Sequence, residues 1–405
     1  MTRGIFSKPA LALAASFVAL ATSAPAVAEP EVDVSGYIEP ELRLFFEDAS
    51  DPRQSGDDAS IAGQLELEIF INDDQTLIVT PFARIDARDD ERTHFDLREA
   101  YYEAVFDRFE LRVGLKRVFW GRIEAAHLID VINQTDNLES IDGEDKLGQP
   151  MVNVTVPTDY GTFDFFWLPY FRERHFPDPE GRPRLDMPIA NDIALYESDR
   201  EDEHQDFAFR WSHYMGAWDF GVSHFYGTSR DPLLMPGLDG NMNPIMIPYY
   251  ALMHQTAVDV QATFGPMLYK FEGFHRWQLR DDWTQATGGI EYSLYGVGGS
   301  AGDLGFVAEY IWDERGETAM NPFQNDAFAG VRWTANDIQS TSVLAGGIFD
   351  LDGNGYVLSV EAERRLGEDF LLQVETRFFV NVPPTDPFHS YVDDDFLQIR
   401  LARYF

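Results

Sequence analysis

The chain has no cysteine, no long apolar run after its first thirty residues and few basic residues for its size. Without cysteine, neither a disulfide nor a thiolate metal site can form. A membrane-spanning helix needs about 20 consecutive, mainly apolar residues, and no such run occurs past the N-terminus. With 31 basic and 69 acidic residues, the formal charge is −38, which excludes nucleic acid as a natural partner.

The N-terminus has the pattern of a secretory signal peptide. Arg3 and Lys8 form a basic start, Leu11 to Ala21 is an apolar stretch, and Ala26-Val27-Ala28 is a small-x-small cleavage pattern. We therefore predict a signal peptide over residues 1–28 and one exported domain over residues 29–405. The alternative, a buried core helix, does not explain the basic start. Removing Arg3 and Lys8 leaves 29 basic against 69 acidic residues, a mature charge of −40.

The rest of the chain alternates between apolar and polar residues with period two. In residues 61–71, for example, Ile61, Leu65 and Leu67 share one face, whereas Glu66 and Glu68 lie on the other. This alternation predicts strands, because a helix would mix the two sets around its circumference. Strands are predicted at 32–47, 60–72, 76–88, 95–106, 109–120, 150–157, 161–171, 205–214, 218–228, 247–264, 267–278, 283–297, 303–314, 325–335, 340–350, 355–365, 370–382 and 395–405.

Short turns alternate with longer connections, the longest over about 121–149, 172–204 and 229–246. This layout, with aromatics at 14% of residues, is typical of a transmembrane antiparallel β-barrel with about 18 strands, 16 being the alternative. In lipid every backbone N–H and C=O needs an internal partner, so a sheet must close. A soluble periplasmic sandwich or propeller is the rival fold. It would have to pack faces dense in charge into a core.

The C-terminus supports a barrel in the bacterial outer membrane. The final strand ends on an aromatic residue, Phe405, and so resembles the closing strand of Gram-negative outer-membrane barrels, where the terminal Phe is an assembly signal. Arg403 departs from that pattern, since such tails usually carry an apolar residue there. The alternative is an edge strand that simply ends the chain. The partners implied are outer-membrane lipid, lipopolysaccharide and the barrel-assembly machinery.

If the apolar faces meet lipid, many charged residues face the lumen, with nearly balanced signs. Rings of charge at a narrow waist set the ion preference of a water-filled pore. The alternative is that these charges pair with one another to hold the wall. From the strands, the residues predicted to line the pore are Arg84, Arg112, Lys116, Arg276, Arg377 and Arg400.

The alternation breaks at Trp120-Gly121, and apolar residues then recur at roughly helical spacing from Ile123 to Ile132. We therefore predict that residues 121–149 form a loop with a short helix, folded into the lumen as a constriction. An ordinary extracellular loop on the rim is the alternative. The residues expected near the passage are Arg117, Arg122, His127 and Asp130.

The run GLKRVFWGRIEAAHLIDVINQTD resembles a motif of proteobacterial outer-membrane porin-like barrels, including alginate-export-type barrels and uncharacterised relatives. The motif is a strand, Trp-Gly and then Asp-x-x-Asn-x-x-Asp, matched by Asp130, Asn133 and Asp136. The resemblance implies an 18-strand barrel with an inward loop, hence a pore, and adds Asn133 and Asp136 to the constriction. The substrate does not carry over, because an alginate exporter is expected to have a strongly basic lumen.

Metal, cofactor and enzyme signals are weak. Asp350, Asp352 and Asn354, followed by Glu361, match the spacing of an EF-hand calcium loop, but strands flank them where helices are required. A tight hairpin is therefore the favoured interpretation, with a surface Ca²⁺ site as the alternative. No cofactor is expected. No hydrolase elbow, zinc-protease helix or phosphate-binding loop appears, and the protein is not expected to be an enzyme.

The leading hypothesis is an outer-membrane, porin-like channel for small hydrophilic solutes. The alternatives are a dedicated exporter of polysaccharide or lipid with periplasmic partners, and a sealed barrel with a surface-binding or structural role. Conductance distinguishes them, because a sealed barrel passes no current. Oligomeric state, solute and direction of transport are left open by the sequence.

Overall fold

A computed structural model describes residues 30–54, 56–319 and 321–405. The predicted signal peptide, residues 1–28, lies outside the described residues and stays a prediction. Within the described part no helix is both long and apolar enough to cross a membrane.

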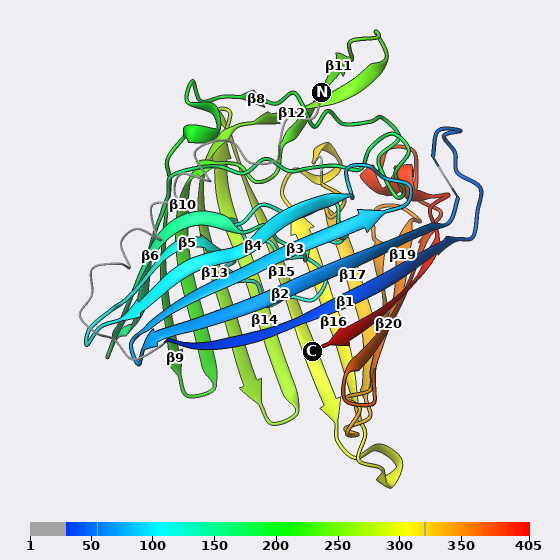
Figure 1. Ribbon diagram of the computed structural model, residues 1–405. Coiled ribbons are helices and arrows are strands. Elements are labelled where there is room, and N and C mark those ends of the chain that lie inside the picture. Colours follow the sequence, from blue (N-terminus) through cyan, green and yellow to red (C-terminus); the bar gives the residue numbers. More distant parts are fainter. Residues whose placement is uncertain (1–29, 55, 320) are drawn as a thin grey trace.

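Eighteen antiparallel strands form one sheet (Figure 1). They are β1 (Glu31–Phe45), β2 (Asp58–Asn72), β3 (Gln75–Asp86), β4 (His94–Val105), β5 (Glu110–Lys116), β6 (Gln149–Thr158), β7 (Gly161–Leu168), β9 (Asp206–Met215), β10 (Trp218–Thr228), β13 (Leu252–Phe264), β14 (Met267–Gln278), β15 (Asp281–Leu294), β16 (Asp303–Asp313), β17 (Asn325–Thr334), β18 (Ser342–Asp350), β19 (Tyr356–Leu366), β20 (Phe370–Val380) and β21 (Phe396–Tyr404).

The sheet closes on itself, because β21 pairs with β1 as well as with β20. Tyr404 lies opposite Tyr37, and the backbone of Phe405 exchanges two hydrogen bonds with Gly36, at 3.0 and 3.1 Å. The terminal aromatic residue therefore completes the seam. No edge of the wall is left unpaired, as a strand-built wall in lipid requires. The predicted 18-strand barrel is confirmed.

The wall is apolar outside and charged inside, as the alternation predicts. On β1, Val34 and Ile38 are 56% and 51% exposed, whereas Glu41 and Arg43 are buried. Such a distribution is unfavourable in water and favourable in a bilayer, where the outward residues contact acyl chains. A closed antiparallel barrel with an apolar outer band is the architecture of an integral protein of the bacterial outer membrane.

The two ends of the barrel differ. One end, the turn end, carries the connections after β2, β4, β6, β9, β13, β15, β17 and β19; the other, the loop end, carries the long connections. A small sheet of β8 (Leu195–Tyr196), β11 (Leu233–Leu238) and β12 (Pro244–Tyr250) lies above the loop end (Figure 1). Short 3₁₀ turns occur at η2 (Glu201–Glu203), η3 (Val297–Gly299), η4 (Gly316–Thr318) and η5 (Pro387–Tyr391).

One predicted strand, 247–264, is wrong as a single element. The pairing of β10 with β13 ends at Thr228 opposite Leu252. Residues before Leu252 therefore have no partner in the wall, and they pair instead with β11 and β8 above it. Apolar alternation continues through both pieces, so the sequence pattern could not show the change of sheet.

Candidate functional site: a loop across the lumen

The constriction loop, residues 117–148, leaves the wall between β5 and β6 and folds into the barrel. This confirms the predicted inward loop, but the predicted short helix is wrong, because residues 117–148 contain turns and no helix. Successive N–H groups from Trp120 to Ala125 donate to carboxylates and not to backbone carbonyls of the same segment. Side chains outside the segment thus replace the hydrogen bonds that would make a helix.

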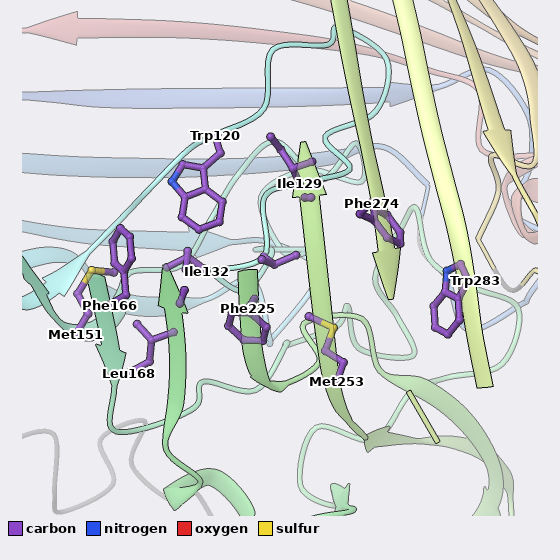
Figure 2. Packing of buried hydrophobic residues seen from close by; sticks show 13 residues of the cluster. Trp120, Ile129, Ile132, Met151, Phe166, Leu168, Phe225, Met253, Phe274 and Trp283 are labelled. Atoms are coloured by element: carbon purple, nitrogen blue, oxygen red, sulfur yellow. The ribbon is translucent and has the colours of Figure 1, made fainter. Parts of the chain in front are cut away.

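Apolar packing holds one half of the constriction loop against the wall. Trp120, Ile129, Val131 and Ile132 are buried in a cluster with side chains from β6 to β15 (Figure 2). The wall contributes Met151, Phe166, Leu168, Ala208, Phe225, Met253, Ala257, Phe274 and Trp283. Burying these side chains contributes roughly 1.5–3 kcal/mol for each large residue. This side of the lumen is therefore filled and dry.

Within the constriction loop, the residues of the Asp-x-x-Asn-x-x-Asp motif organise the chain. Asp130 accepts the N–H groups of Trp120 and Gly121, the latter at 2.9 Å. Asn133 accepts the N–H of Val118 at 2.9 Å and donates its amide to two backbone carbonyls at 2.8 Å. Asn133 and Asp136 are buried. The motif fixes the course of the loop, while its predicted place in the pore lining stays a prediction.

Ion pairs hold the other half of the constriction loop to the opposite side of the wall. Glu139 accepts from Arg84 of β3, with the closest contact at 2.7 Å, and Asp136 pairs with Arg98 of β4. Asp142 pairs with Arg377 of β20 at 3.3 Å. The constriction loop is therefore fastened on both sides of the lumen.

The guanidinium groups on this side are buried and compensated. Arg84 also pairs with Glu41 at 3.3 Å, and Arg92 contacts Glu41 at 2.9 Å and Asp86 at 2.6 Å. Burial would raise the pKa of the Glu139 carboxyl, but the charge of Arg84 outweighs it and lowers that pKa. The network is close to neutral and lies largely out of contact with water, so it acts as structure.

Two carboxylates of the constriction loop, Glu144 and Asp145, are exposed to water. The side chain of Glu144 is 65% exposed, whereas that of Arg84 is 2% exposed. Asp145 is open to the lumen as well. Enclosure by the barrel, together with the nearby charges of Glu139, Asp136 and Asp142, raises the pKa of Asp145 to about 7.

An open space of about 290 Å³ borders the constriction loop inside the barrel. It is lined by Phe119, Gly121, Ile123, Glu124, His127, Asp130, Glu144 and Lys146. Glu124 pairs with Arg332 of β17 at 2.6 Å, and Lys146 donates to Thr135 at 3.1 Å. Glu144 lies 3.8 Å from His127 and raises the pKa of that imidazole.

The structure brings only part of the predicted set to the constriction loop. Arg84, Arg377, His127 and the three motif residues contact or belong to it, and Arg122 within it pairs with Asp259 at 2.9 Å. Arg400 pairs with Glu375 at 3.7 Å. Arg117, the first residue of the constriction loop, pairs with Glu99 of the wall. The others lie apart, each with a partner in the wall or the rim: Arg112 with Glu103 and Glu110, Lys116 over the ring of Tyr101, and Arg276 with Asp231.

Four residues that hold the constriction loop were not among the predicted site residues: Arg98, Glu139, Glu272 and Glu309. Period-two alternation places Glu272 and Glu309 on inward faces, which is the only sequence signal that they carry. Alternation does not place Arg98 there, because the register of β3 and β4 shifts beside it, between Thr80 and Pro81. Which inward charge meets the loop depends on where the loop crosses the lumen, and the alternation holds no information on that.

A second long connection, the strap loop of residues 169–205, crosses the loop end. It follows β7, and its Arg182 reaches Asp394 at 2.5 Å, between β20 and β21. Arg184 pairs with Asp51, between β1 and β2, at 2.7 Å. The strap loop therefore narrows the mouth above the constriction loop (Figure 1).

Two groups of side chains have the composition of a metal site, but in both some ligand atoms are already engaged in other contacts. Asp350, Asp352 and Asn354 lie at the hairpin between β18 and β19, where Asp350 accepts the N–H of Asp352 at 2.8 Å. Among the described residues, ligand atoms of His94, Asp136 and Glu139 converge within 4.8 Å. Both carboxylates, however, are already paired with Arg98 and Arg84. Nearby guanidinium charge opposes a bound cation.

Comparison with known proteins supports the fold. No protein-family model and no curated protein matches the chain. Among solved structures, Pseudomonas aeruginosa OccD3 (OpdP) superimposes with a TM-score of 0.54 at 10% identity, covering 96% of this chain and 97% of that one. Pseudomonas aeruginosa OpdO superimposes with a TM-score of 0.51 at 10% identity, covering 92% of this chain and 96% of that one. Pseudomonas aeruginosa OpdQ superimposes with a TM-score of 0.51 at 8% identity, covering 94% of this chain and 98% of that one.

At such low identity these likenesses show a shared fold and no shared substrate. The resemblance to alginate-export-type barrels stays a prediction. The chain is a porin-like, 18-strand barrel of the bacterial outer membrane with a loop folded across its lumen.

Proposed function

We propose that the protein is a channel through which small hydrophilic solutes diffuse across the outer membrane. One observation carries this proposal: the constriction loop narrows the lumen but leaves an open space of about 290 Å³ bordered by ionisable side chains. A loop that served only to fill the barrel would present apolar or fully paired side chains here, because an unpaired charge away from water is costly.

The water-exposed carboxylates of the constriction loop favour cations over anions. The arginines on the wall beside the constriction loop are buried in ion pairs, whereas Glu144 and Asp145 are open to water. A wet charge attracts mobile ions of the opposite sign, and a compensated pair does not. We therefore infer a cation preference, although the charges predicted from the strands are balanced in sign.

The first test is single-channel recording of the refolded mature protein in planar bilayers of neutral lipid. We expect discrete, voltage-stable openings and, under a KCl gradient, a reversal potential of the sign for K⁺ over Cl⁻. A preparation that has folded, judged by heat-modifiable mobility in gels, and yet passes no current would contradict the proposal.

A silent barrel would favour a sealed surface-binding or structural role, because the strap loop crosses the mouth and is fixed at the far rim by Arg182 and Arg184. A dedicated exporter of polysaccharide or lipid is the other alternative. It requires a periplasmic partner at the turn end, so current that appears only with a partner present would support it.

The cation preference is expected to depend on pH through Asp145. Since its pKa is raised to about 7, Asp145 is neutral below that pH and negative above it. Between pH 5.5 and 8.5 the cation preference should therefore rise with pH, with a midpoint near 7. In Asp145→Asn this step should shrink to the part that His127 contributes, because the pKa of His127 is also raised and its positive charge is lost as the pH rises.

Asp73→Asn, in the turn between β2 and β3, is the matched control and should keep the full pH step. A step of the same size in Asp145→Asn would show that another group sets the pH dependence.

A further inference from the structure

Two carboxylates of the barrel wall grip the backbone of the constriction loop. Glu272 of β14 accepts the N–H groups of Arg122 and Ile123 through one oxygen, Oε1, the second at 3.1 Å. Glu309 of β16 accepts the N–H of Glu124 through Oε1 and that of Ala125 through Oε2, both at 2.9 Å. Four successive amides are thus held by two side chains from different strands.

These contacts lie on the side of the constriction loop that borders the open space. Ile123 and Glu124 line that space, and Glu124 continues to Arg332 on the next strand. Both carboxylates are buried, Glu272 completely and Glu309 to 96%. A hydrogen bond to a charged acceptor in a site that excludes water is stronger than one between neutral groups.

We infer that Glu272 and Glu309 are positioning residues that set the aperture of the channel, by fixing residues 122–125 against β14 and β16. This inference rests on the proposed function. Segments on either side have other anchors: the apolar cluster holds Trp120 and Ile129, and ion pairs hold Asp136 to Asp142. The side chains of Arg122 and Glu124 also pair with Asp259 and Arg332. The backbone amides of residues 122–125, however, bond only to the two carboxylates, so loss of these carboxylates loosens this edge of the passage and leaves the wall intact.

The two carboxylates bind differently, which makes their Gln variants unequal. In Glu309→Gln, one oxygen of the pair becomes an NH₂ group, and a donor then faces the N–H of Glu124 or Ala125. In Glu272→Gln, the remaining oxygen can still accept both N–H groups, so only the charge is lost. Glu309→Gln should therefore loosen the loop more than Glu272→Gln, and the double variant should loosen it most.

Single-channel recording tests this ranking. We expect Glu309→Gln to show open-channel current noise several times that of the unaltered protein, with added conductance levels, and Glu272→Gln to show a smaller rise. Glu363→Gln is the matched control, since Glu363 of β19 bonds to Ser342 of the wall at 3.2 Å and not to the loop. Folded barrels of both variants with unaltered noise and conductance would overturn the inference.

Because the chain has no cysteine, two introduced cysteines allow a reversible form of this test within a single protein. The double variant Ala125→Cys, Glu309→Cys removes the hydrogen bonds that Glu309 accepts, and it places one thiol on the constriction loop and one on the wall. A short bifunctional methanethiosulfonate, which links the two thiols, should then lower the open-channel current noise, and dithiothreitol should restore it. Noise that does not respond to this cycle in a cross-linked, folded barrel would also overturn the inference.

Amide hydrogen exchange in detergent micelles separates this inference from the proposed function. Glu309→Gln should speed exchange at Glu124 or Ala125, whichever faces the new NH₂ group, by about tenfold to a hundredfold, the factor for losing a hydrogen bond to a charged acceptor. Exchange at Asn133 should not change. If the unaltered protein passes no current, the channel proposal fails. Even then, faster exchange in Glu309→Gln supports the role of Glu309 in fixing the loop, and unchanged exchange rejects it.

Discussion

Excision of residues 122–145, with Gly121 joined to Lys146 through a short glycine-serine linker, is expected to raise single-channel conductance by about threefold or more. The constriction loop crosses the lumen from the apolar cluster on one side to Arg84 and Arg377 on the other. Without it the passage is limited only by the wall and the strap loop. Conductance in 1 M KCl, recorded beside the unaltered protein, measures the change.

The excised protein should still fold, because every wall strand keeps its two neighbours. The arginines released from Asp136 and Glu139 would then lie in a flooded lumen, where water solvates them. The matched control removes residues 234–247 of the hairpin formed by β11 and β12, which lies above the loop end (Figure 1). That control should conduct like the unaltered protein. Equal conductance in both deletions would show that the constriction loop does not limit flow.

Replacing Arg84 by Ala is expected to destabilise the folded barrel by about 3–5 kcal/mol, the cost of leaving buried carboxylates without their partner. Arg84 contacts Glu139, Glu41 and Ser60, and its side chain is 2% exposed. The free energy of unfolding, from urea titration in detergent or lipid vesicles, measures the effect. Adding Glu139→Ala should recover part of the loss, since one unpaired charge is then removed.

Arg112→Ala is the control for this prediction. Arg112 also pairs with two carboxylates, Glu103 and Glu110, but all three side chains are partly open to water, at 18%, 28% and 33%. Its loss should cost less than about 1 kcal/mol. Similar costs for the two arginines would mean that burial does not distinguish the network beneath the constriction loop from ordinary pairs of the wall.

Strand bounds depend mainly on local pattern, whereas strand partners do not. Strands such as 218–228 and 267–278 were predicted to the residue, because each alternates cleanly and a short turn bounds it. The strand predicted at 247–264 was wrong, since its apolar alternation is shared by two sheets and only the pairing partner changes. Alternation reports that a segment is extended and two-faced, and it holds no information on the neighbouring strand.

The constriction loop shows the same limit at the candidate site. Its inward course was predictable, because a long, partly apolar segment interrupts a strand at Trp120-Gly121. The short helix predicted within residues 121–149 was wrong, since Glu272 and Glu309 satisfy amides that a helix would have used. Those carboxylates are about 150 and 185 positions away in the chain, so local spacing holds no trace of the contact.

By itself, the sequence determined the wall: an even number of amphipathic strands with apolar faces outward, closing because lipid leaves no unpaired edge. It also determined that the interior would be charged and that one loop would enter it. Only the tertiary structure decided which charged side chains pair with one another and which contact water. That outcome depends on distances between residues far apart in the chain, where a shift of a few ångströms turns a wet carboxylate such as Glu144 into a buried, paired one such as Glu139.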